Sequence, residues 1–281
     1  MPHVLITGAG GQVGRELVDA FAGYDITAAD RTDLDITDEA SVRSAIRTLR
    51  PDVVVNAAAW TDVDGCEADP VRAHLVNAAP LRWLSEACAA QGARLCHIST
   101  DYVFDGRSSR PYTESDPPNP VSVYGRSKRA GELELDASAT LVRTSWVFGV
   151  HGHNIVKTVL GLLGRSEPLR FVDDQVGCPT EAAELARSIR HLIDGGHHGT
   201  FHVVNEGAMS WFELARHVAA CAGSDIDQIL PVATADLVPP RPAPRPANSR
   251  LARPAAEATG IPLPGPATDA IARVVSKLVA A

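Results

Sequence analysis

The start of the chain constrains its fold more than any other segment. The β-branched run "HVLITG" (3–8) leads through a glycine-rich turn into the helical pattern of "GGQVGRELVDAF" (10–21). The glycines Gly8, Gly11 and Gly14 have a G-x-x-G-x-x-G spacing, which permits a tight turn and close backbone approach. Free N–H groups at the start of such a helix can hold a pyrophosphate. The turn therefore predicts a dinucleotide-binding unit, although a glycine turn can also serve packing alone.

Short β-branched runs alternate with helical patterns over the first half of the chain. The later runs are "YDITAAD" (24–30), "DVVVNAAAW" (52–60), "ARLCHIST" (93–100) and "ATLVRTSWVFG" (139–149). Continuous apolar strands separated by helices are typical of a parallel sheet that helices cover on both faces. The sequence therefore predicts an α/β fold with a doubly wound, Rossmann-like parallel sheet.

The pattern loosens after about Gly149. Two helices remain clear, "TEAAELARSIRHLI" (180–193) and "SWFELARHVAACA" (210–222), with apolar positions three and four residues apart. The proline-rich segment 230–254 predicts an extended loop, and a last helix is expected over about 268–279. We expect a dinucleotide-binding domain over 1–148, with parts of 172–205. A smaller C-terminal substrate-binding lobe is expected from 149–171 and 206–281.

The composition excludes several classes of protein. A formal charge of −8 over 281 residues argues against a nucleic-acid partner, because nucleic-acid binders concentrate Lys and Arg into a basic face. Five cysteines without a C-x-x-C pair indicate neither a disulfide framework nor a zinc site. No apolar segment reaches the roughly 18 residues of a membrane span, and no basic leader precedes the first apolar run. We therefore expect a soluble, cytoplasmic protein with no membrane partner.

The end of the second predicted strand offers two side chains that favour opposite cofactors. Asp30 can accept hydrogen bonds from an adenosine ribose, whereas Arg31 can pair with a 2′-phosphate. The pattern predicts NADH or NADPH without choosing between them. The segment 30–38 can also be only a solvated loop in which Asp38 caps the next helix. The small residues 57–59 leave room for a cofactor at the end of the third strand, or for packing alone.

Tyr124 and Lys128 lie four residues apart at the predicted start of a helix, in "VYGRSKRAGELE" (123–134). Residues with this spacing share one helix face, so both side chains can point into one cleft. A neighbouring positive charge favours the ionised form of a phenol, and we expect Lys128 to lower the pKa of Tyr124. Ser99 or Thr100, at the end of the preceding strand, can hydrogen-bond the same reacting oxygen. Such a set suits ketone reduction, in which a cofactor gives hydride to carbon and Tyr124 gives the proton to oxygen.

The chain resembles the dTDP-4-dehydrorhamnose reductase family of the extended short-chain dehydrogenase/reductase superfamily. The resemblance covers nearly the whole length and rests on "TGAGGQVG", "RTDLDITD", "NAAAWTDVDGCE", "STDYVFDG", "VYGRSK", "RTSWVFG", "DQVGCPT" and "RPANSRL". It implies NAD(P)H-dependent reduction of the 4-keto group of dTDP-4-dehydrorhamnose, giving dTDP-L-rhamnose for surface polysaccharide.

The resemblance also implies roles for individual residues. The implied catalytic residues are Thr100, Tyr124 and Lys128. The cofactor contacts from the glycine turn, the strand ends and the catalytic helix are Gly8, Gly11, Gln12, Val13, Gly14, Asp30, Arg31, Asp35, Ile36, Ala57, Ala58, Ala59, Tyr124 and Lys128. The implied substrate contacts are Thr61, Val63, Thr100, Asp101, Tyr102 and Trp146. Some relatives form magnesium-bridged dimers through an acid at the place of Glu16, but no metal is predicted here because its partner acids are not identified. We expect a monomer or a homodimer.

The diphosphate of a dTDP-sugar needs placed cations in a chain of this net charge. Arg241, Arg245, Arg250 and Arg253 lie in the proline-rich segment, and planar guanidinium groups suit phosphate oxygens. We expect Arg245 or Arg250 to face the diphosphate, although any one of these arginines can serve solubility alone. The histidines in "HGH" (151–153) and "HH" (197–198) lack acidic or cysteine partners at ligand spacing, which argues against a metal site.

Two alternatives to the reductase stay open. One is another sugar-nucleotide enzyme of the superfamily, an epimerase or a dehydratase; Thr100 is followed by Asp101 and Tyr102 rather than by the acid pair of related dehydratases, which disfavours the latter. The other is a catalytically silent NADP-binding regulatory subunit, which the intact Thr100, Tyr124 and Lys128 disfavour.

Overall fold

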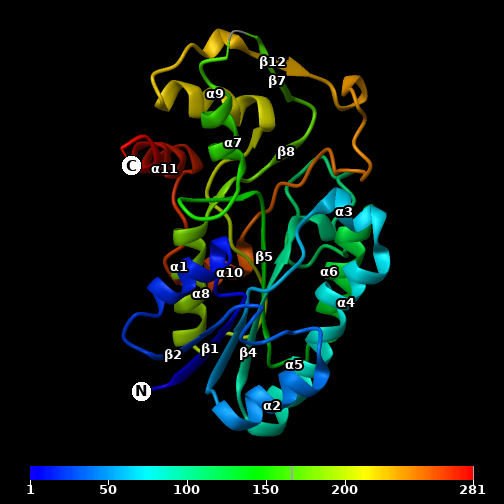
Figure 1. Cartoon of the computed structure of the whole chain (residues 1–281), viewed down its shortest axis with the longest axis vertical. Coiled ribbons are helices and arrows are strands. Elements are labelled where there is room, and N and C mark those ends of the chain that lie inside the picture. The colour runs from blue at the N-terminus through cyan, green and yellow to red at the C-terminus, as the bar shows by residue number, and fades with distance from the viewer. Residues whose placement is uncertain (166, 281) are drawn as a thin grey trace.

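A six-stranded parallel sheet forms the centre of the molecule in the computed structural model, which describes residues 1–165 and 167–280 (Figure 1). Its spatial order is β10-β5-β4-β3-β1-β2, and every neighbouring pair is parallel. The order reverses between β1 and β3, and in such sheets ligands bind beyond the carboxyl ends of the strands at this point. The predicted doubly wound α/β fold is confirmed. The strands are β1 (His3–Thr7), β2 (Asp25–Ala29), β3 (Val53–Asn56), β4 (Arg94–Thr100), β5 (Thr140–Thr144) and β10 (Gly199–His202).

Both faces of the sheet are covered because successive strand residues point to opposite faces. Val4 and Ile6 pack in one cluster with α1 (Gln12–Ala20) and α8 (Ala182–Asp194). Leu5, between them, packs in another cluster with α2 (Glu39–Leu49) and α5 (Ala79–Gln91). Three further helices lie along the α5 side of the sheet: α3 (Val63–Ala68), α4 (Pro70–Asn77) and α6 (Val123–Glu132).

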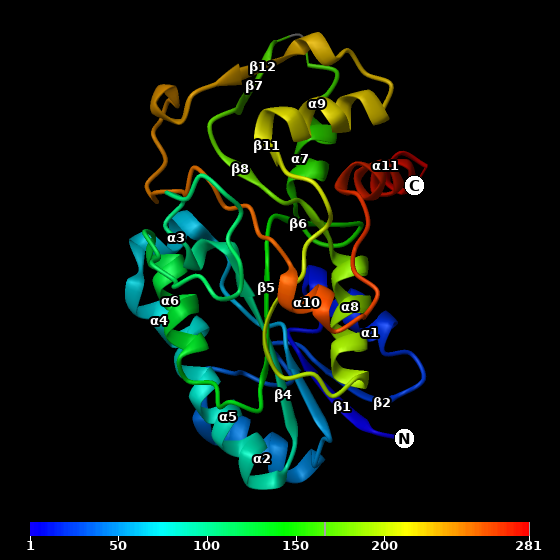
Figure 2. The same ribbon diagram turned by 180° about the vertical axis from the view of Figure 1, so that it is seen from behind.

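A separate apolar cluster lies beyond the carboxyl ends of the central strands (Figure 2). It joins α7 (Ile155–Leu162), α9 (Trp211–Cys221) and α11 (Ala267–Val279) to the paired strands β7 (Leu169–Val172) and β12 (Ile229–Val232). The short strands of this region are β6 (Val147–Phe148), β8 (Val176–Gly177), β9 (Thr180–Glu181) and β11 (Met209–Ser210). The predicted lobe boundaries stay a prediction, and residues 166 and 281 lie outside the described chain.

Two elements differ from the sequence expectation. The predicted strand 139–149 is broken into β5 and β6, because Trp146 has a left-handed φ of 46°, which a strand cannot accommodate. The segment 230–254 contributes three residues to β12 and a short 3-10 helix (Thr234–Asp236), and α10 (Pro254–Ala258) begins at its last residue. Helix α11 begins at Ala267, within one residue of the expected start. No helix in residues 1–165 and 167–280 has the length and apolarity to cross a membrane.

Candidate active site

The glycine turn between β1 and α1 brings two backbone segments into close contact. Gly8 has a left-handed φ of 69°, and a Cβ at this position would lie 2.7 Å from the Ala58 backbone. A Cβ at Gly14 would clash with the carbonyl oxygen of Gly8. Helix α1 has no side-chain cap and no acidic residue in its first turn, so its N–H groups are free to donate to an anionic ligand. The turn therefore fits the pyrophosphate of a dinucleotide.

A cavity of about 450 Å³, here called the turn cavity, opens beside these glycines. Most of the predicted cofactor contacts line it: Gly8, Gly11, Asp30, Arg31, Asp35, Ile36, Ala57, Ala58 and Ala59. Gly14 lies beneath the turn, against Gly8 and Ala9. The turn cavity thus joins the ends of β1, β2 and β3, which are far apart in sequence.

The two side chains that favour opposite cofactors differ in their surroundings. The Oδ1 atom of Asp30 accepts hydrogen bonds from the N–H and hydroxyl of Thr32, both at 2.7 Å, so its own loop already uses that oxygen. These bonds lower the pKa of Asp30. The exposed Arg31 side chain lines the same cavity. Asp38 caps α2 by accepting from the Ala40 N–H, as the alternative interpretation of this loop expected.

Helix α6 is anchored at its first turn, where Tyr124 lies. The Ser122 hydroxyl caps the helix by accepting from the Gly125 N–H. Glu67, from α3, accepts from the Val123 N–H at 2.7 Å. Two side chains thus satisfy N–H groups that a helix start leaves free, and they fix the direction in which Tyr124 points.

Tyr124 is buried in an apolar pocket formed by Cys66 and Ala73, with Trp60, Val63 and Tyr102 packed around it. Burial raises the pKa of Tyr124 above its ordinary value, and a hydrogen bond with the Thr100 side chain acts in the opposite direction. The structure therefore differs from the expectation that Lys128 lowers this pKa, because removal from water raises it most and the Asp101 charge acts in the same direction. A raised pKa keeps the phenol protonated at neutral pH, which is the form a proton donor needs.

Ser99 and Thr100, the two hydroxyl candidates at the end of β4, both line the cavity in which Tyr124 lies. Of the two, Thr100 affects the pKa of Tyr124. Its Oγ1 donates to Asp101 Oδ1 at 3.0 Å and accepts from the Tyr102 N–H at 3.2 Å. Burial raises the pKa of Asp101 to about 6, against hydrogen bonds from Ser249, Ser145 and Thr100. The Asp101 carboxylate thus orients the hydroxyl of Thr100.

Lys128 is 1% exposed, and its Nζ atom makes two hydrogen bonds to β4. Nζ donates to the carbonyl oxygen of Ile98 at 2.8 Å and lies 3.0 Å from His97 Nε2. Burial lowers the pKa of Lys128 to about 8, with Glu132 acting in the opposite direction. The ammonium group is therefore held by the strand that also carries Thr100.

Tyr124, Lys128 and Thr100 line one cavity of about 580 Å³, here called the tyrosine cavity. Gly11, Ala57 and Ala59 line both this cavity and the turn cavity, so the two adjoin. The remaining predicted residues that the tyrosine cavity brings together are Gln12, Val13, Thr61, Val63, Asp101, Tyr102 and Trp146. The predicted catalytic, cofactor and substrate residues thus meet in one place.

A third cavity of about 710 Å³, here called the arginine cavity, continues from the tyrosine cavity past Thr61, Tyr102 and Trp211. Arg241 and Arg245 line it. Arg245 forms a two-pronged ion pair with Asp64, at 3.0 and 2.8 Å, and Arg241 lies 3.6 Å from the same carboxylate. The cavity is lined by three arginines, Arg170, Arg241 and Arg245, and by two aspartates, Asp62 and Asp64, which leaves it a net positive charge.

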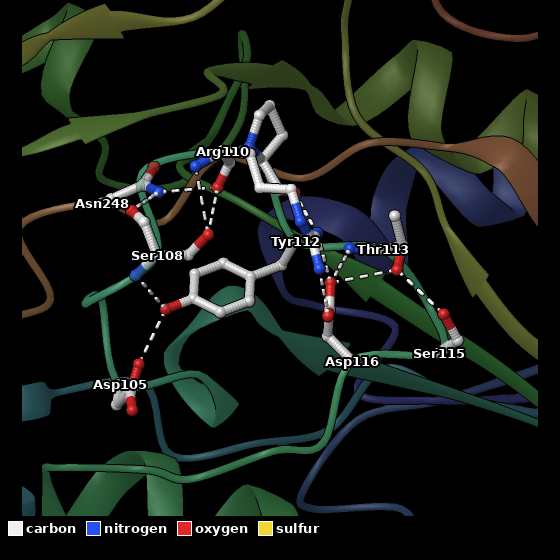
Figure 3. A network of polar contacts seen from close by, with 9 residues as sticks. Asp105, Ser108, Arg110, Tyr112, Thr113, Ser115, Asp116 and Asn248 are labelled. Atoms are coloured by element: carbon white, nitrogen blue, oxygen red, sulfur yellow. Dashed lines mark hydrogen bonds and ion pairs between the residues drawn. The ribbon is translucent and has the colours of Figure 1, made fainter.

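Arg250, the other arginine expected to face a diphosphate, has different contacts. Its guanidinium donates to Asn248 Oδ1 at 2.8 Å and to the Ser109 carbonyl oxygen at 2.8 Å, and Arg250 is not among the residues that line the three cavities. Asn248 in turn donates to the carbonyl oxygens of Ser108 and Arg110, within the network that ties 105–116 to the "RPANSRL" segment (Figure 3). In this structure the Arg250 side chain thus belongs to that network, and its contact with a diphosphate stays a prediction.

Glu16 lies close to other charged side chains of the same region. Its carboxylate is 3.9 Å from His151 Nε2, and burial raises its pKa. Arg273 binds the carboxylates of both Glu181 and Glu184, at 2.7 and 2.6 Å. Within the described residues no group of three potential metal-ligating side chains is found.

Three residues at the site carry no sequence signal of their own. Trp211, the first residue of α9, stacks on Trp146 with ring centroids 3.4 Å apart and lines the tyrosine and arginine cavities. His97 and Asn56 lie inside predicted strands and are fully buried; His97 contacts Lys128, and Asn56 contacts His97. Trp211 follows a capping serine at the start of a clear helix, and its position alone did not distinguish it from a core residue.

Comparison with known proteins assigns this architecture to a family. The family model described as "RmlD substrate binding domain" matches residues 2–280. The chain belongs to this family. A dTDP-4-dehydrorhamnose reductase of Mycobacterium tuberculosis is 44% identical, over 89% of this chain and 84% of the relative. A dTDP-4-keto-6-deoxy-D-glucose reductase of Streptomyces niveus is 42% identical over 81% of each chain. The crystal structure of the Bacillus anthracis dTDP-4-dehydrorhamnose reductase in complex with NADP has a TM-score of 0.93 and 36% identity, covering 98% of this chain and 99% of that one.

Proposed function

We propose that this chain is a nicotinamide-dependent reductase that converts the 4-keto group of dTDP-4-dehydrorhamnose to a hydroxyl, giving dTDP-L-rhamnose. One observation carries the proposal: Tyr124, Thr100 and Lys128 line a cavity that adjoins the glycine turn on one side and the arginine cavity on the other. The relatives of the family named above are reductases of dTDP-sugars, and one binds NADP.

The proposed ligands divide between the cavities according to their chemistry. The turn cavity would hold the adenosine half of NADPH or NADH, with the pyrophosphate at the N–H groups of α1. The arginine cavity would hold the dTDP moiety, with its diphosphate near Arg241 and Arg245 and its base near Trp211. The keto-sugar would then lie in the tyrosine cavity.

The chain's residues supply the acid chemistry of this reaction. The reduced nicotinamide provides a hydride for the carbonyl carbon when it is bound. Tyr124 donates its phenolic proton to the carbonyl oxygen. The Thr100 hydroxyl, which donates to Asp101 here, would turn its hydrogen to that oxygen once the keto-sugar is bound. The Lys128 ammonium stabilises the phenolate that forms on Tyr124.

A second dTDP-sugar is a candidate substrate because the Streptomyces niveus relative is named for dTDP-4-keto-6-deoxy-D-glucose. The presence of Thr100, Tyr124 and Lys128 in one cavity favours catalysis over a silent NADP-binding subunit. An epimerase would return its cofactor to the starting oxidation state, whereas a reductase consumes it.

The experiment that tests the proposal is incubation of the purified protein with each keto-sugar and with NADPH or NADH. We expect the absorbance at 340 nm to fall by one cofactor equivalent for each sugar consumed. Chromatography and NMR of the product should then show a new hydroxyl group at C4. Cofactor binding without oxidation would contradict a reductase and favour a silent subunit, and sugar inversion without net oxidation would favour an epimerase.

We propose a cytoplasmic location and a monomer or a homodimer for this enzyme. The described cysteines are all free thiols, and four of the five are buried, as in proteins of a reducing compartment. Analytical ultracentrifugation measures the oligomeric state directly.

A further inference from the structure

His97 is a fully buried titratable residue next to the proposed catalytic lysine, and no role has yet been given to it. Its ring spans the space between two polar side chains. Nε2 lies 3.0 Å from Lys128 Nζ, and Nδ1 lies 3.1 Å from Asn56 Nδ2. Asn56 in turn contacts Thr7 on β1. A hydrogen-bonded chain thus crosses the sheet from β1 through β3 and β4 to α6.

The orientation of the Asn56 amide is fixed by a backbone group. The N–H of Ala58 can only donate, and it lies 3.2 Å from Asn56 Oδ1, which therefore has to be the oxygen. The Thr7 hydroxyl donates to the same oxygen at 2.6 Å. The nitrogen Nδ2 must then face His97, to which it donates. Asn56 is fully buried, so no water competes for these bonds.

The orientation of Asn56 determines the tautomer of His97. Because Nδ1 accepts from Asn56, the single proton of the neutral ring lies on Nε2. Burial, and to a smaller extent the Lys128 charge, lower the pKa of His97 well below its ordinary value, so the ring is neutral. The Nε2–H bond therefore points at Lys128 Nζ.

The two protonation states of Lys128 fit this arrangement differently. An ammonium group has only hydrogens, so it would place a donor against the Nε2–H of His97. A neutral amine has one lone pair, which accepts from His97, and two hydrogens. One hydrogen donates to the Ile98 carbonyl oxygen, at 2.8 Å, and the other can face the tyrosine cavity that Lys128 lines.

We propose that His97, held in its Nε2–H tautomer by Asn56 and Thr7, is a positioning residue that favours the uncharged amine of Lys128. The other titratable or charged groups around Lys128 are Tyr124 and Glu132 on α6, with Arg129 and Arg143 bound to Glu132. Because Glu132 is paired with these two arginines, its charge only partly opposes the effect of burial, and the pKa of Lys128 stays at about 8.

This inference deepens the proposed function and rests on it for its catalytic meaning. After Tyr124 has given its proton to the sugar oxygen, its phenolate has to regain one. The lower the pKa of the Lys128 ammonium is relative to that of Tyr124, the more favourable is the transfer of a proton from the ammonium to this phenolate. The donor is the ammonium form of Lys128: one Nζ–H bond breaks, the phenolic O–H bond forms again, the neutral amine that remains accepts from His97, and water then reprotonates that amine.

The test is an NMR titration of the full chain labelled with ¹³C at the lysine Cε. The chain has three lysines, Lys128, Lys157 and Lys277, so the spectrum is simple, and a Lys128→Met variant assigns the signal. We expect Lys128 to titrate about two pH units below the other two. If all three titrate together, the proposal is wrong. This measurement needs no substrate, so it stands or falls independently of the proposed reductase activity.

Asn56→Asp gives the sharper test because it keeps the shape and reverses the tautomer. A carboxylate at position 56 still accepts from Ala58 and Thr7, but it also accepts from Nδ1–H, which leaves Nε2 as an acceptor for the ammonium. We expect the pKa of Lys128 to rise by about one pH unit or more, and the basic limb of the kcat profile to move with it. A folded variant whose Lys128 titrates as in the wild type would overturn the proposal.

Two further variants keep this test decisive. If Asn56→Asp does not fold, His97→Gln replaces it, because its amide can turn a carbonyl oxygen to Nζ and should also raise the pKa of Lys128; an unchanged pKa would contradict the role of His97. His202→Gln is the matched control. His202 is equally buried, but it bonds to the Ala252 carbonyl oxygen and takes no part in the hydrogen bonds that link Asn56, His97 and Lys128. It should leave the Lys128 signal unchanged.

Discussion

The turn cavity and the arginine cavity are built in different ways. The turn cavity is formed mainly by residues at three adjacent strand ends, with glycines where a Cβ would clash. The arginine cavity is formed by long side chains from distant segments, and two of its arginines, Arg241 and Arg245, already contact Asp64. The turn cavity depends on glycine positions that carry no side chain, whereas the arginine cavity depends on charged side chains that packing holds in place. Substitutions should therefore affect the two cavities by different mechanisms.

The largest effect in this comparison is expected for Gly14→Ala. The added methyl group meets the Gly8 carbonyl oxygen and displaces the turn, at a cost of about 1–3 kcal/mol in strain. We expect the Kd of NADPH to rise by about 5- to 150-fold, together with a loss of stability. Fluorescence titration and urea unfolding measure the two effects.

Gly161→Ala is the matched control for this prediction. Gly161 lies in α7, and a Cβ there would have no neighbour within 4 Å. The substitution should stabilise the protein by up to about 1 kcal/mol and leave cofactor affinity unchanged. Equal affinities for NADPH in the two variants would show that the turn tolerates a side chain at Gly14.

The difference between the cavities also explains what the sequence could predict. The spacing of Gly8, Gly11 and Gly14 is local, and the alternation of Val4, Leu5 and Ile6 reports directly which faces are buried, so the fold and the turn followed from the sequence. The left-handed Trp146 could not be foreseen, because its conformation depends on residues brought in by folding, such as Trp211. Arg245 and Arg250 look alike in sequence, and only their partners, Asp64 and Asn248, separate them.

Arg245→Ala should have the next largest effect, and it should fall on the substrate. Removing one guanidinium leaves Asp64 with only Arg241 nearby and lowers the positive charge of the arginine cavity. We expect the KM for the dTDP-sugar to rise by about 10- to 100-fold, since bonds to charged groups contribute about 1.5–3 kcal/mol. Steady-state kinetics measures the KM, and NADPH affinity should stay within about twofold.

Arg250→Ala is the control for Arg245→Ala. Because Arg250 bonds to Asn248 and Ser109, its loss should lower the free energy of unfolding by about 1–2 kcal/mol with little change in KM. A KM that rises as much in this variant as in Arg245→Ala would contradict the separation of the two arginines.

The smallest effect is expected for Arg31→Ala, which alters the choice of cofactor. Asp30 is used by its own loop, whereas the exposed Arg31 side chain lines the turn cavity and can meet a 2′-phosphate. We expect the ratio of kcat/KM for NADPH over NADH to fall by about fivefold, since an exposed charge contributes roughly 1 kcal/mol. If the ratio does not change, another group recognises the phosphate.

The most direct test of the account is turnover by Tyr124→Phe, compared with Tyr112→Phe. Both substitutions remove one buried tyrosine hydroxyl, but the hydroxyl of Tyr112 bonds to Asp105 and Ser108 in the network of Figure 3 rather than lying in the tyrosine cavity. The account predicts that kcat falls by about 10²- to 10⁴-fold in Tyr124→Phe, with the Kd of NADPH within about twofold, while Tyr112→Phe keeps its turnover. Wild-type turnover in Tyr124→Phe would contradict the role of this phenol as the proton donor.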